Sequence, residues 1–262
     1  MSGNEETAGP VFGTARFALQ VGEVSIQMEA RLPDGPVKPG VLLPVLQNLS
    51  DSLSKLSERG AEEAGKQISC REGCGACCRQ AVPITPVEAR AIAQWLDTQP
   101  AERRAALRER FRQAAARLEE SGIARQIRES ALQRDVMHEV GLRYFALGIA
   151  CPFLEQERCT IHEMRPLRCR EYLVVSPAAH CAHPGEMEIV TVKPPAMLSQ
   201  VLARWDTSGD MKERELIVLT MLDEWVAKHP ADQDRPHRTS PELLQEFLRA
   251  FASEDAKPAA ES

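Results

Sequence analysis

The sequence lacks an uninterrupted apolar run of the length, roughly 18 residues or more, that a membrane-spanning helix requires. Its first residues, MSGNEETAGP, contain neither the positive charges nor the apolar stretch of an export signal. A basic excess is missing too, because 32 Lys and Arg face 38 Asp and Glu, and the net charge of −6 argues against a general binder of nucleic acid or anionic membranes. We therefore expect a cytoplasmic protein with neither nucleic acid nor a membrane as a partner.

Familiar catalytic and nucleotide-binding motifs are also missing. The sequence contains no P-loop, no G-x-G-x-x-G and no G-x-S-x-G element. His138 and Glu139 match the start of the zinc-protease motif H-E-x-x-H, but Leu142 occupies the position of the second histidine. No acid, base or nucleophile stands out apart from the cysteine thiols, so the sequence leaves open whether the protein is an enzyme.

The chain does contain eight cysteines within an otherwise ordinary globular composition, 43% hydrophobic and 27% charged. At 262 residues it can bury a sizeable apolar core. In a reducing cytoplasm this many cysteines indicate metal binding or redox chemistry more often than a disulfide framework.

The N-terminal part predicts a β-hairpin followed by a helix. In RFALQVGEVSIQMEARL, apolar and polar residues alternate on both sides of Gly22-Glu23, which fits a two-residue type II′ turn. After the linker DGPVKPG, leucines spaced four and three apart predict an amphipathic helix over residues 44–59, with Gly60 as its stop. About two heptads are short for a coiled coil, so we expect this leucine seam to pack on the main domain.

Helices are predicted for most of the remaining chain. Thr85-Pro86-Val87-Glu88 forms a capping box that opens a helix ending near Leu96. Further helices are expected from Pro100, over residues 123–145, from Asp210 and Glu213 to Pro230, and after Ser240-Pro241. Residues 188–193, EIVTVK, are expected to form a lone strand that could pair with the N-terminal hairpin.

These patterns predict a mainly α-helical fold with a small β-hairpin or sheet, its helices and loops organised around a cysteine-bound metal centre. We divide the chain into a disordered N-terminal tail (residues 1–12), a β-hairpin plus amphipathic helix (13–66), a cysteine-cluster metal-binding domain (67–200), C-terminal helices packing on that domain (201–252) and a disordered tail (253–262).

The cysteines form a dense group within SCREGCGACCR and a spread group downstream. All eight are candidate metal ligands: Cys70, Cys74, Cys77, Cys78, Cys151, Cys159, Cys169 and Cys181. Two residues between Cys74 and Cys77 let both thiolates reach one ion. The adjacent side chains of Cys77 and Cys78 diverge, so they suit two different metals, or a bridging position, better than one ion, and a disulfide between them would be strained. We infer two neighbouring metal centres or one polynuclear cluster.

The charge of such a site requires compensation. Eight thiolates around two divalent ions leave a formal charge of about −4 in a poorly solvated place. Arginines flank the cysteines and are expected to offset this charge and to lower the thiol pKa values. They are Arg71, Arg79, Arg165, Arg168 and Arg170.

Together, GCGACCR, CPFL, the cysteine of CTIH, RPLRCREY and SP-x3-C resemble the YkgJ-like cysteine-cluster family, also called CxxCxxCC. The similarity covers roughly residues 67–182, about half of the chain. It implies chelation of zinc or iron by these cysteines, and family members are sometimes described as iron–sulfur oxidoreductases. A similar cluster occurs in flagellin lysine methylases, which gives a protein-modifying role some precedent by analogy.

The chain departs from the family pattern at two places. Three residues separate Cys70 from Cys74 where the family name has two, which leaves the role of Cys70 open. His162 stands where the family commonly has tyrosine, a position that is usually not a ligand, so packing near the site is favoured over metal binding. His180 and His183, on either side of Cys181, are auxiliary ligand candidates.

Two other cysteine chemistries fit less well. Cys70, Cys74 and Cys77 have the C-x3-C-x2-C spacing of a radical-SAM loop, but Ala76 replaces the usual aromatic residue and no repeated βα units predict a barrel. A thioredoxin-like C-x-x-C needs a βαβ context, whereas a helix and a polar turn precede Cys70.

The predicted function is metal binding, with zinc or iron, or an iron–sulfur centre such as a [4Fe–4S] cluster, held by up to eight thiolates. Zinc would serve as a structural ion, whereas an iron–sulfur centre would permit electron transfer. Three classes stay open: a structural or interaction module that recognises a protein partner, an iron–sulfur oxidoreductase or protein-modifying enzyme, and a metal chaperone or sensor.

Overall fold

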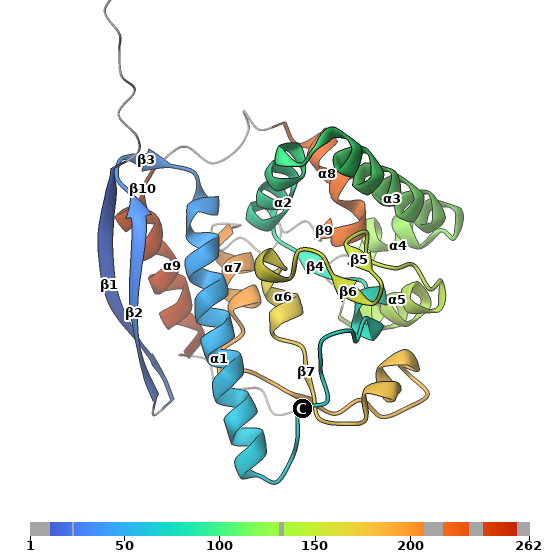
Figure 1. Cartoon of the computed structure of the whole chain (residues 1–262), viewed down its shortest axis with the longest axis horizontal. Helices are drawn as coiled ribbons and strands as arrows, with labels where there is room; N and C mark the ends of the chain where they lie inside the picture. The colour runs from blue at the N-terminus through green and yellow to red at the C-terminus, as the bar shows by residue number, and fades with distance from the viewer. Residues whose placement is uncertain (1–10, 23, 131–133, 207–216, 231–237, 256–262) are drawn as a thin grey trace, which may run out of the picture.

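The structure is a computed structural model that describes residues 11–22, 24–130, 134–206, 217–230 and 238–255. Within this part the chain is mainly helical with small two-stranded sheets, which confirms the predicted fold class (Figure 1). Most of both predicted tails, Glu23 of the predicted turn, and the predicted cap residues Asp210 and Glu213 lie outside the described residues. No helix in the described part is long and apolar enough to cross a membrane.

The α-helices are α1 (Leu43–Glu63), α2 (Pro86–Thr98), α3 (Ala101–Glu120), α4 (Ile123–Ser130), α5 (Arg134–Ala146), α6 (Leu167–Arg170), α7 (Leu198–Asp206), α8 (Leu222–Lys228) and α9 (Ser240–Asp255). Short 3₁₀ helices are η1 (Pro39–Leu42), η2 (Ala76–Arg79), η3 (His162–Met164), η4 (Ala178–Ala182) and η5 (Leu219–Met221). Five antiparallel pairs are described: β1 (Phe12–Val21) with β2 (Val24–Pro33), β3 (Pro36–Val37) with β10 (Arg238–Thr239), β4 (Pro83–Ile84) with β9 (Ile217–Val218), β5 (Leu154–Glu155) with β6 (Arg158–Cys159), and β7 (Leu173–Val174) with β8 (Thr191–Val192).

The predicted N-terminal hairpin is present. β1 and β2 pair in the register Leu19 to Ile26, and Gly22 has the positive φ of 57° that a tight turn requires. Alternate residues, among them Leu19, Val21 and Leu32, point into the core. The period-two pattern therefore predicted both the strands and their buried face.

The leucine seam of α1 packs within the chain. Leu42, Leu46, Leu49 and Leu53 are all at most 2% exposed and share a core with the hairpin, α7 and α9. The predicted stop at Gly60 is wrong, because α1 continues to Glu63. Ala61, just beyond the glycine, is buried, and such packing outweighs the cost of about 1 kcal/mol that a helical glycine carries.

The capping box of α2 is formed as predicted: the Glu88 backbone N–H donates to the Thr85 hydroxyl, and the Thr85 backbone N–H donates to the Glu88 carboxylate. The helix from Pro100 is α3, which buries Leu107, Phe111 and Leu118. Ala114 is buried there as well, whereas Ala115 is partly exposed.

Three further predictions are corrected. The single helix over residues 123–145 is two helices, α4 and α5, on either side of residues 131–133. The strand within residues 188–193 is only β8, and it pairs with β7 rather than with the N-terminal hairpin. The helix expected to end at Pro230 starts late, at Leu222, after β9 and η5. Pairing partners so distant in sequence are not visible in local periodicity.

Apolar residues form three core clusters. The first joins the hairpin, α1, α7 and α9, the second joins α2, α3, α8 and the loop residues Phe153 and Ile161, and the third joins α3, α4 and α5. In Figure 1 the hairpin, α1 and α9 lie on one side, α2 to α5 and α8 lie on the other, and α6 lies between them. Cys151 and Cys159 pack against the second core cluster. The division into the five segments given above stays a prediction.

Candidate metal centre

A tight turn sets the spacing of the first two cysteines. The Cys74 backbone N–H donates to the Arg71 carbonyl at 3.2 Å, and Gly73 has a φ of 81° at the third turn position. A non-glycine residue would be strained there. The three-residue gap between Cys70 and Cys74 is therefore the length of a glycine-containing β-turn.

η2 carries the adjacent cysteines and packs closely against the β5–β6 hairpin. A Cβ atom added at Gly75 would lie 2.9 Å from Leu154 Cδ1 and closer still to Glu157 Oε2, so this position admits only glycine without rearrangement. Arg79 donates both to the Gly75 carbonyl at 2.9 Å and to the Glu157 carboxylate. The small residues between Cys74 and Cys77 thus allow a close approach of two cysteine-bearing segments.

Cys151 precedes the short β5–β6 hairpin, and Cys159 is the last residue of β6. The Cys151 backbone N–H donates to the Cys78 carbonyl at 2.7 Å, which fixes this segment beside η2. Gln156 and Glu157 both have positive φ, at 51° and 60°, as a two-residue type I′ turn requires. The turn returns the chain so that Cys159 pairs with Leu154.

Cys169 lies in α6, which is held at both ends. The buried Glu88 carboxylate accepts a hydrogen bond from the Leu167 backbone N–H at 2.8 Å, linking α6 to the capping box of α2. Arg170, only 4% exposed, donates from its Nη1 atom to both carboxylate oxygens of Asp51 of α1, at 2.7 Å each. One short helix therefore positions a thiol between α1 and α2.

Cys70 and Cys181 come together through the segment after β7. The Ser69 backbone N–H donates to the Val174 carbonyl at 2.8 Å, and the Ser69 hydroxyl donates to the Ser176 carbonyl at 2.6 Å. The Cys70 thiol lies 3.9 Å from the Tyr172 carbonyl. η4, which contains Cys181, packs against η2. The first and the last cysteine of the chain thus face the same part of the molecule.

All eight cysteines are free thiols. We sort them into two groups by the thiols that act on Cys181 and on Cys169, and we place Cys78 with Cys151 because its carbonyl accepts a hydrogen bond from the Cys151 backbone N–H. Burial raises the pKa of Cys181, and the thiols of Cys70, Cys77 and Cys74 raise it further. We call Cys70, Cys74, Cys77 and Cys181 the outer group, because Cys70 is exposed.

The remaining cysteines form the inner group, which consists of Cys78, Cys151, Cys159 and Cys169. Burial raises the pKa of Cys169 well above its usual value, with further elevation by Cys151, Cys77 and Cys159. Burial likewise raises the pKa of Cys151 to about 12.

The chain has two tyrosines, and each lies beside one group. Burial raises the pKa of Tyr172, with additional elevation by Cys181, Cys77 and Cys70, all of the outer group. Burial raises the pKa of Tyr144 to about 12, and Cys151 of the inner group raises it further. Cys77 acts on members of both groups, and the pKa of its own thiol is raised first by its hydrogen bond with Cys78. The adjacent pair therefore stands where the two groups meet.

Arg165 is the arginine whose charge acts on the largest number of the cysteine thiols. Its positive charge opposes the upward pKa shifts of Cys70, Cys77, Cys159 and Cys169, which belong to both groups. Its Nε atom is buried and has no hydrogen-bond partner among the described residues. A guanidinium left without such a partner beside several thiols is suited to compensate thiolate charge.

The other flanking arginines are engaged elsewhere or act on single thiols. Arg79 pairs with Glu157 and Arg170 with Asp51, although Arg170 also slightly lowers the pKa of Cys159. Arg168 is exposed and acts on Glu171. Spacing in the sequence gave no means of ranking Arg165 above its neighbours.

The three candidate histidines are placed at the edge of the site. His162 is exposed, and burial together with the charges of Arg165 and Arg170 lowers its pKa. The His180 Nδ1 atom lies 2.7 Å from the Glu188 carbonyl oxygen, and His183 lies 3.7 Å from Glu186. Their roles as ligands stay predictions.

The thiols lie in one region of the molecule, but their side chains are not arranged around a common ion position. Across the described part of the chain, no three His, Cys, Asp or Glu side chains are arranged to hold a metal ion. Electrostatic repulsion acts over many ångströms, whereas a zinc–sulfur bond measures about 2.3 Å, so the two observations agree. The donor set itself fits zinc or iron, because thiolates are the usual ligands of structural zinc and of iron–sulfur clusters.

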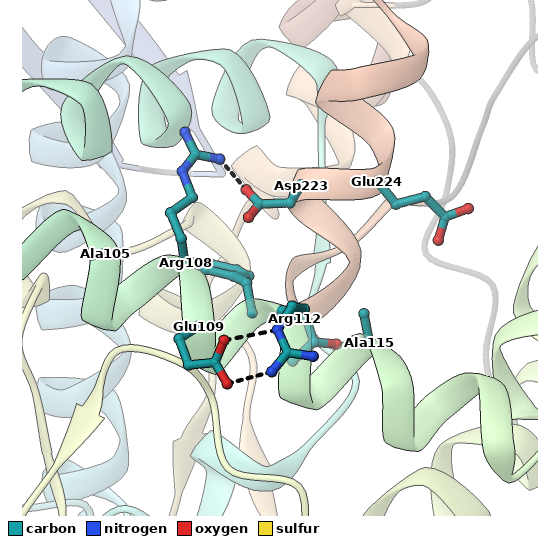
Figure 2. Close-up of a pocket in the computed structure, with 9 residues that line it drawn as sticks. Ala105, Arg108, Glu109, Arg112, Ala115, Asp223 and Glu224 are labelled. Carbon is teal, nitrogen blue, oxygen red and sulfur yellow. Dashed lines mark hydrogen bonds and ion pairs between the residues drawn. The ribbon is translucent and has the colours of Figure 1, made fainter.

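A cavity of about 550 Å³ lies between α3 and α8, away from the cysteines. Figure 2 shows Arg108 of α3 reaching Asp223 of α8, with Glu109 and Arg112 paired along α3. None of the residues that line this cavity is a cysteine or histidine, so it is no part of the candidate metal centre.

Residues 69–190 match the family model CxxCxxCC, described as "Putative zinc- or iron-chelating domain". This confirms the family resemblance that the cysteine motifs predicted. Neither the curated proteins nor the solved structures contain a match to the chain.

Proposed function

We propose that this CxxCxxCC domain, residues 69–190, holds zinc or iron ions through up to eight thiolates. The supporting observation is the assembly of eight free thiols from separate loops in one region, with the Arg165 guanidinium among them. Burial and mutual repulsion disfavour thiolates there, and a bound cation would relieve both effects. The ligands we propose are Cys70, Cys74, Cys77, Cys78, Cys151, Cys159, Cys169 and Cys181.

The proposed arrangement is two neighbouring centres, one for each group. Four thiolates complete a tetrahedral zinc site, so eight supply two such sites. Cys77 would belong to the outer centre and Cys78 to the inner one, which gives the adjacent cysteines different ions. Cys77 is also placed to bridge, because its thiol acts on cysteines of both groups.

The role we propose for the ions is to fix loops that the apolar core does not fix. The cysteines lie on turns, short 3₁₀ helices and two-residue strands between the first and second core clusters. Filled thiolate sites connect such segments and contribute directly to folding free energy. An iron–sulfur centre would in addition provide electron transfer. A reducing compartment such as the cytoplasm suits a site that depends on free thiols.

Anaerobic purification followed by elemental analysis and a visible absorption spectrum tests the proposal. Colourless protein with two zinc ions per chain supports the structural centre. Brown protein with iron and acid-labile sulfide supports an iron–sulfur centre and favours the oxidoreductase or protein-modifying alternative. Folded protein that contains neither metal and retains eight reactive thiols would refute the proposal.

A further inference from the structure

The β1–β2 hairpin is a long two-stranded ribbon with an open edge. Its strands pair continuously from Phe12 with Pro33 to Val21 with Val24, and the register contains no bulge. Among the described strands β1 pairs with β2 alone, and it lies at the outer side of the molecule (Figure 1). An unpaired edge of this length is a template for pairing with another extended strand.

Alternate residues of β1 direct their backbone groups to this open edge. The Asp34 backbone N–H donates to the Val11 carbonyl at 2.7 Å, so the backbone of Val11 and of every second residue after it faces β2. The N–H and C=O groups of the residues between them point away from β2. These residues are Phe12, Thr14, Arg16, Ala18 and Gln20, and all five are exposed.

We propose that β1 pairs with β1 of a second copy of this chain, antiparallel and about a two-fold axis at Phe17. The two ribbons then form one four-stranded sheet, in the order β2, β1, β1 and β2, through the same surface of both copies. The inference is independent of the proposed metal centre, because the hairpin contains no cysteine.

The register around Phe17 makes the strand complementary to itself. On the inner face of the ribbon, Phe17 lies opposite its own copy, and Ala15 lies opposite Leu19 of the second copy. Ala15 and Phe17 are only partly buried against the first core cluster, whereas Leu19 is 6% exposed. The pairing therefore covers the half-open end of each strand with the packed end of the other, and apolar cross-strand pairs of this kind stabilise antiparallel sheets.

The charges of β1 permit this register. Arg16 is the one charged residue of β1, and its Nε atom pairs with Glu29 Oε2 of β2 at 2.8 Å. In the register around Phe17, Arg16 lies opposite Ala18 of the second copy, so like charges do not face each other directly. β1 also lacks lysine, proline and bulges, which protect many natural edge strands from pairing.

The edge of β2 is less suited to such pairing. The Ser240 hydroxyl donates to the Pro33 carbonyl at 2.7 Å, which ties the end of β2 to α9. Pro33 itself has no backbone N–H to offer a further strand. β2 also carries two charged residues, Glu29 and Arg31. The β1 edge is therefore the one we assign to the second copy.

Sedimentation equilibrium of the full-length protein over a dilution series tests the proposal. We expect a concentration-dependent species of twice the mass of one chain. Ala18 and Gln27 face each other across the ribbon, and their N–H groups point to opposite edges. Ala18→Pro removes a donor of the β1 edge and should abolish the dimer. Gln27→Pro is the matched control at the β2 edge and should retain it.

The contrary outcomes are distinct. A monomer at every concentration would overturn the inference, and so would a dimer that survives Ala18→Pro. Loss of the dimer in Gln27→Pro as well would overturn the assignment to the β1 edge.

Hydrogen exchange of the wild-type protein, measured by NMR, gives a test that does not depend on a folded variant. In the dimer, the outward amides of Thr14, Arg16, Ala18 and Gln20 are hydrogen-bonded to the second copy. They should therefore exchange as slowly as the amides that face β2, and their protection should fall on dilution. Fast exchange of these four amides at high protein concentration would exclude strand pairing at this edge.

Discussion

Single residues decide how the two groups of thiols are connected. Cys77 and Cys78 follow each other in η2, yet Cys77 acts electrostatically on Cys181 while the Cys78 backbone contacts Cys151. Arg165 reaches thiols of both groups with one charge. Cys77, Cys78 and Arg165 therefore connect the two groups. The other six cysteines are positioned by their own loops.

Replacing one cysteine of the adjacent pair tests the assignment to two centres. We expect Cys78→Ala to lose one metal equivalent per chain and to keep the other, because Cys78 belongs to the inner centre alone. Metal content by elemental analysis measures this, with Ala76→Ser in the same 3₁₀ helix as the control. Unchanged stoichiometry in Cys78→Ala would refute the assignment.

Gly75 offers a test of close packing beside the cysteines. Gly75→Ala places a methyl group against Leu154 and Glu157, and we expect a loss of about 1–3 kcal/mol in the free energy of unfolding, as is usual for overpacking. Denaturant unfolding measures the change. Glu157→Ala removes the nearest obstacle, so Gly75→Ala should cost less in that background. An equal cost in both backgrounds would show that Glu157 is not the obstruction.

Local sequence patterns correctly predicted the helices, strands and turns that depend on residues close together in the chain. The alternation around Gly22 predicted the hairpin, the leucine seam predicted α1, and Thr85 with Glu88 predicted the start of α2. The predictions failed where contacts with residues distant in the sequence determine the secondary structure. β8 pairs with β7, β9 replaces the first part of an expected helix by pairing with β4, and burial of Ala61 carries α1 past Gly60.

The anchoring of α6 gives a prediction at this scale. Arg170→Ala removes the buried guanidinium that binds Asp51 and the carbonyls of Arg165 and Glu163, and we expect it to lower the free energy of unfolding by about 2–4 kcal/mol. Arg168→Ala, on the exposed side of the same helix, is the matched control and should change stability by less than about 0.5 kcal/mol. Equal effects of the two variants in thermal or denaturant unfolding would contradict the anchoring role of Arg170.

Across the whole molecule, the sequence predicted which residues are candidate ligands but not how they are arranged. Eight cysteines in two stretches of the chain and the family motifs were visible in the printed letters. The expected divergence of Cys77 from Cys78 was not found, because their side chains are hydrogen-bonded to each other. Three features depend on distances between remote segments: the outer and inner groups, the position of Arg165, and the contact of Gly75 with Glu157. Spacing in a sequence measures only how far apart two residues can be, so these features required the fold.

Metal removal should destabilise the cysteine-bearing segments more than the helices of the first core cluster. The first core cluster contains no cysteine, whereas Cys151 and Cys159 pack against the second. Hydrogen–deuterium exchange of protein stripped with a chelator should therefore show lost protection in η2, β5–β6, α6 and η4, with α1 and α9 protected as before. Arg170 couples α6 to α1, so any loss in α1 should be confined to the turn around Asp51. Uniform loss of protection would mean that the metal centres stabilise the entire fold. No loss would mean that they stabilise none of it.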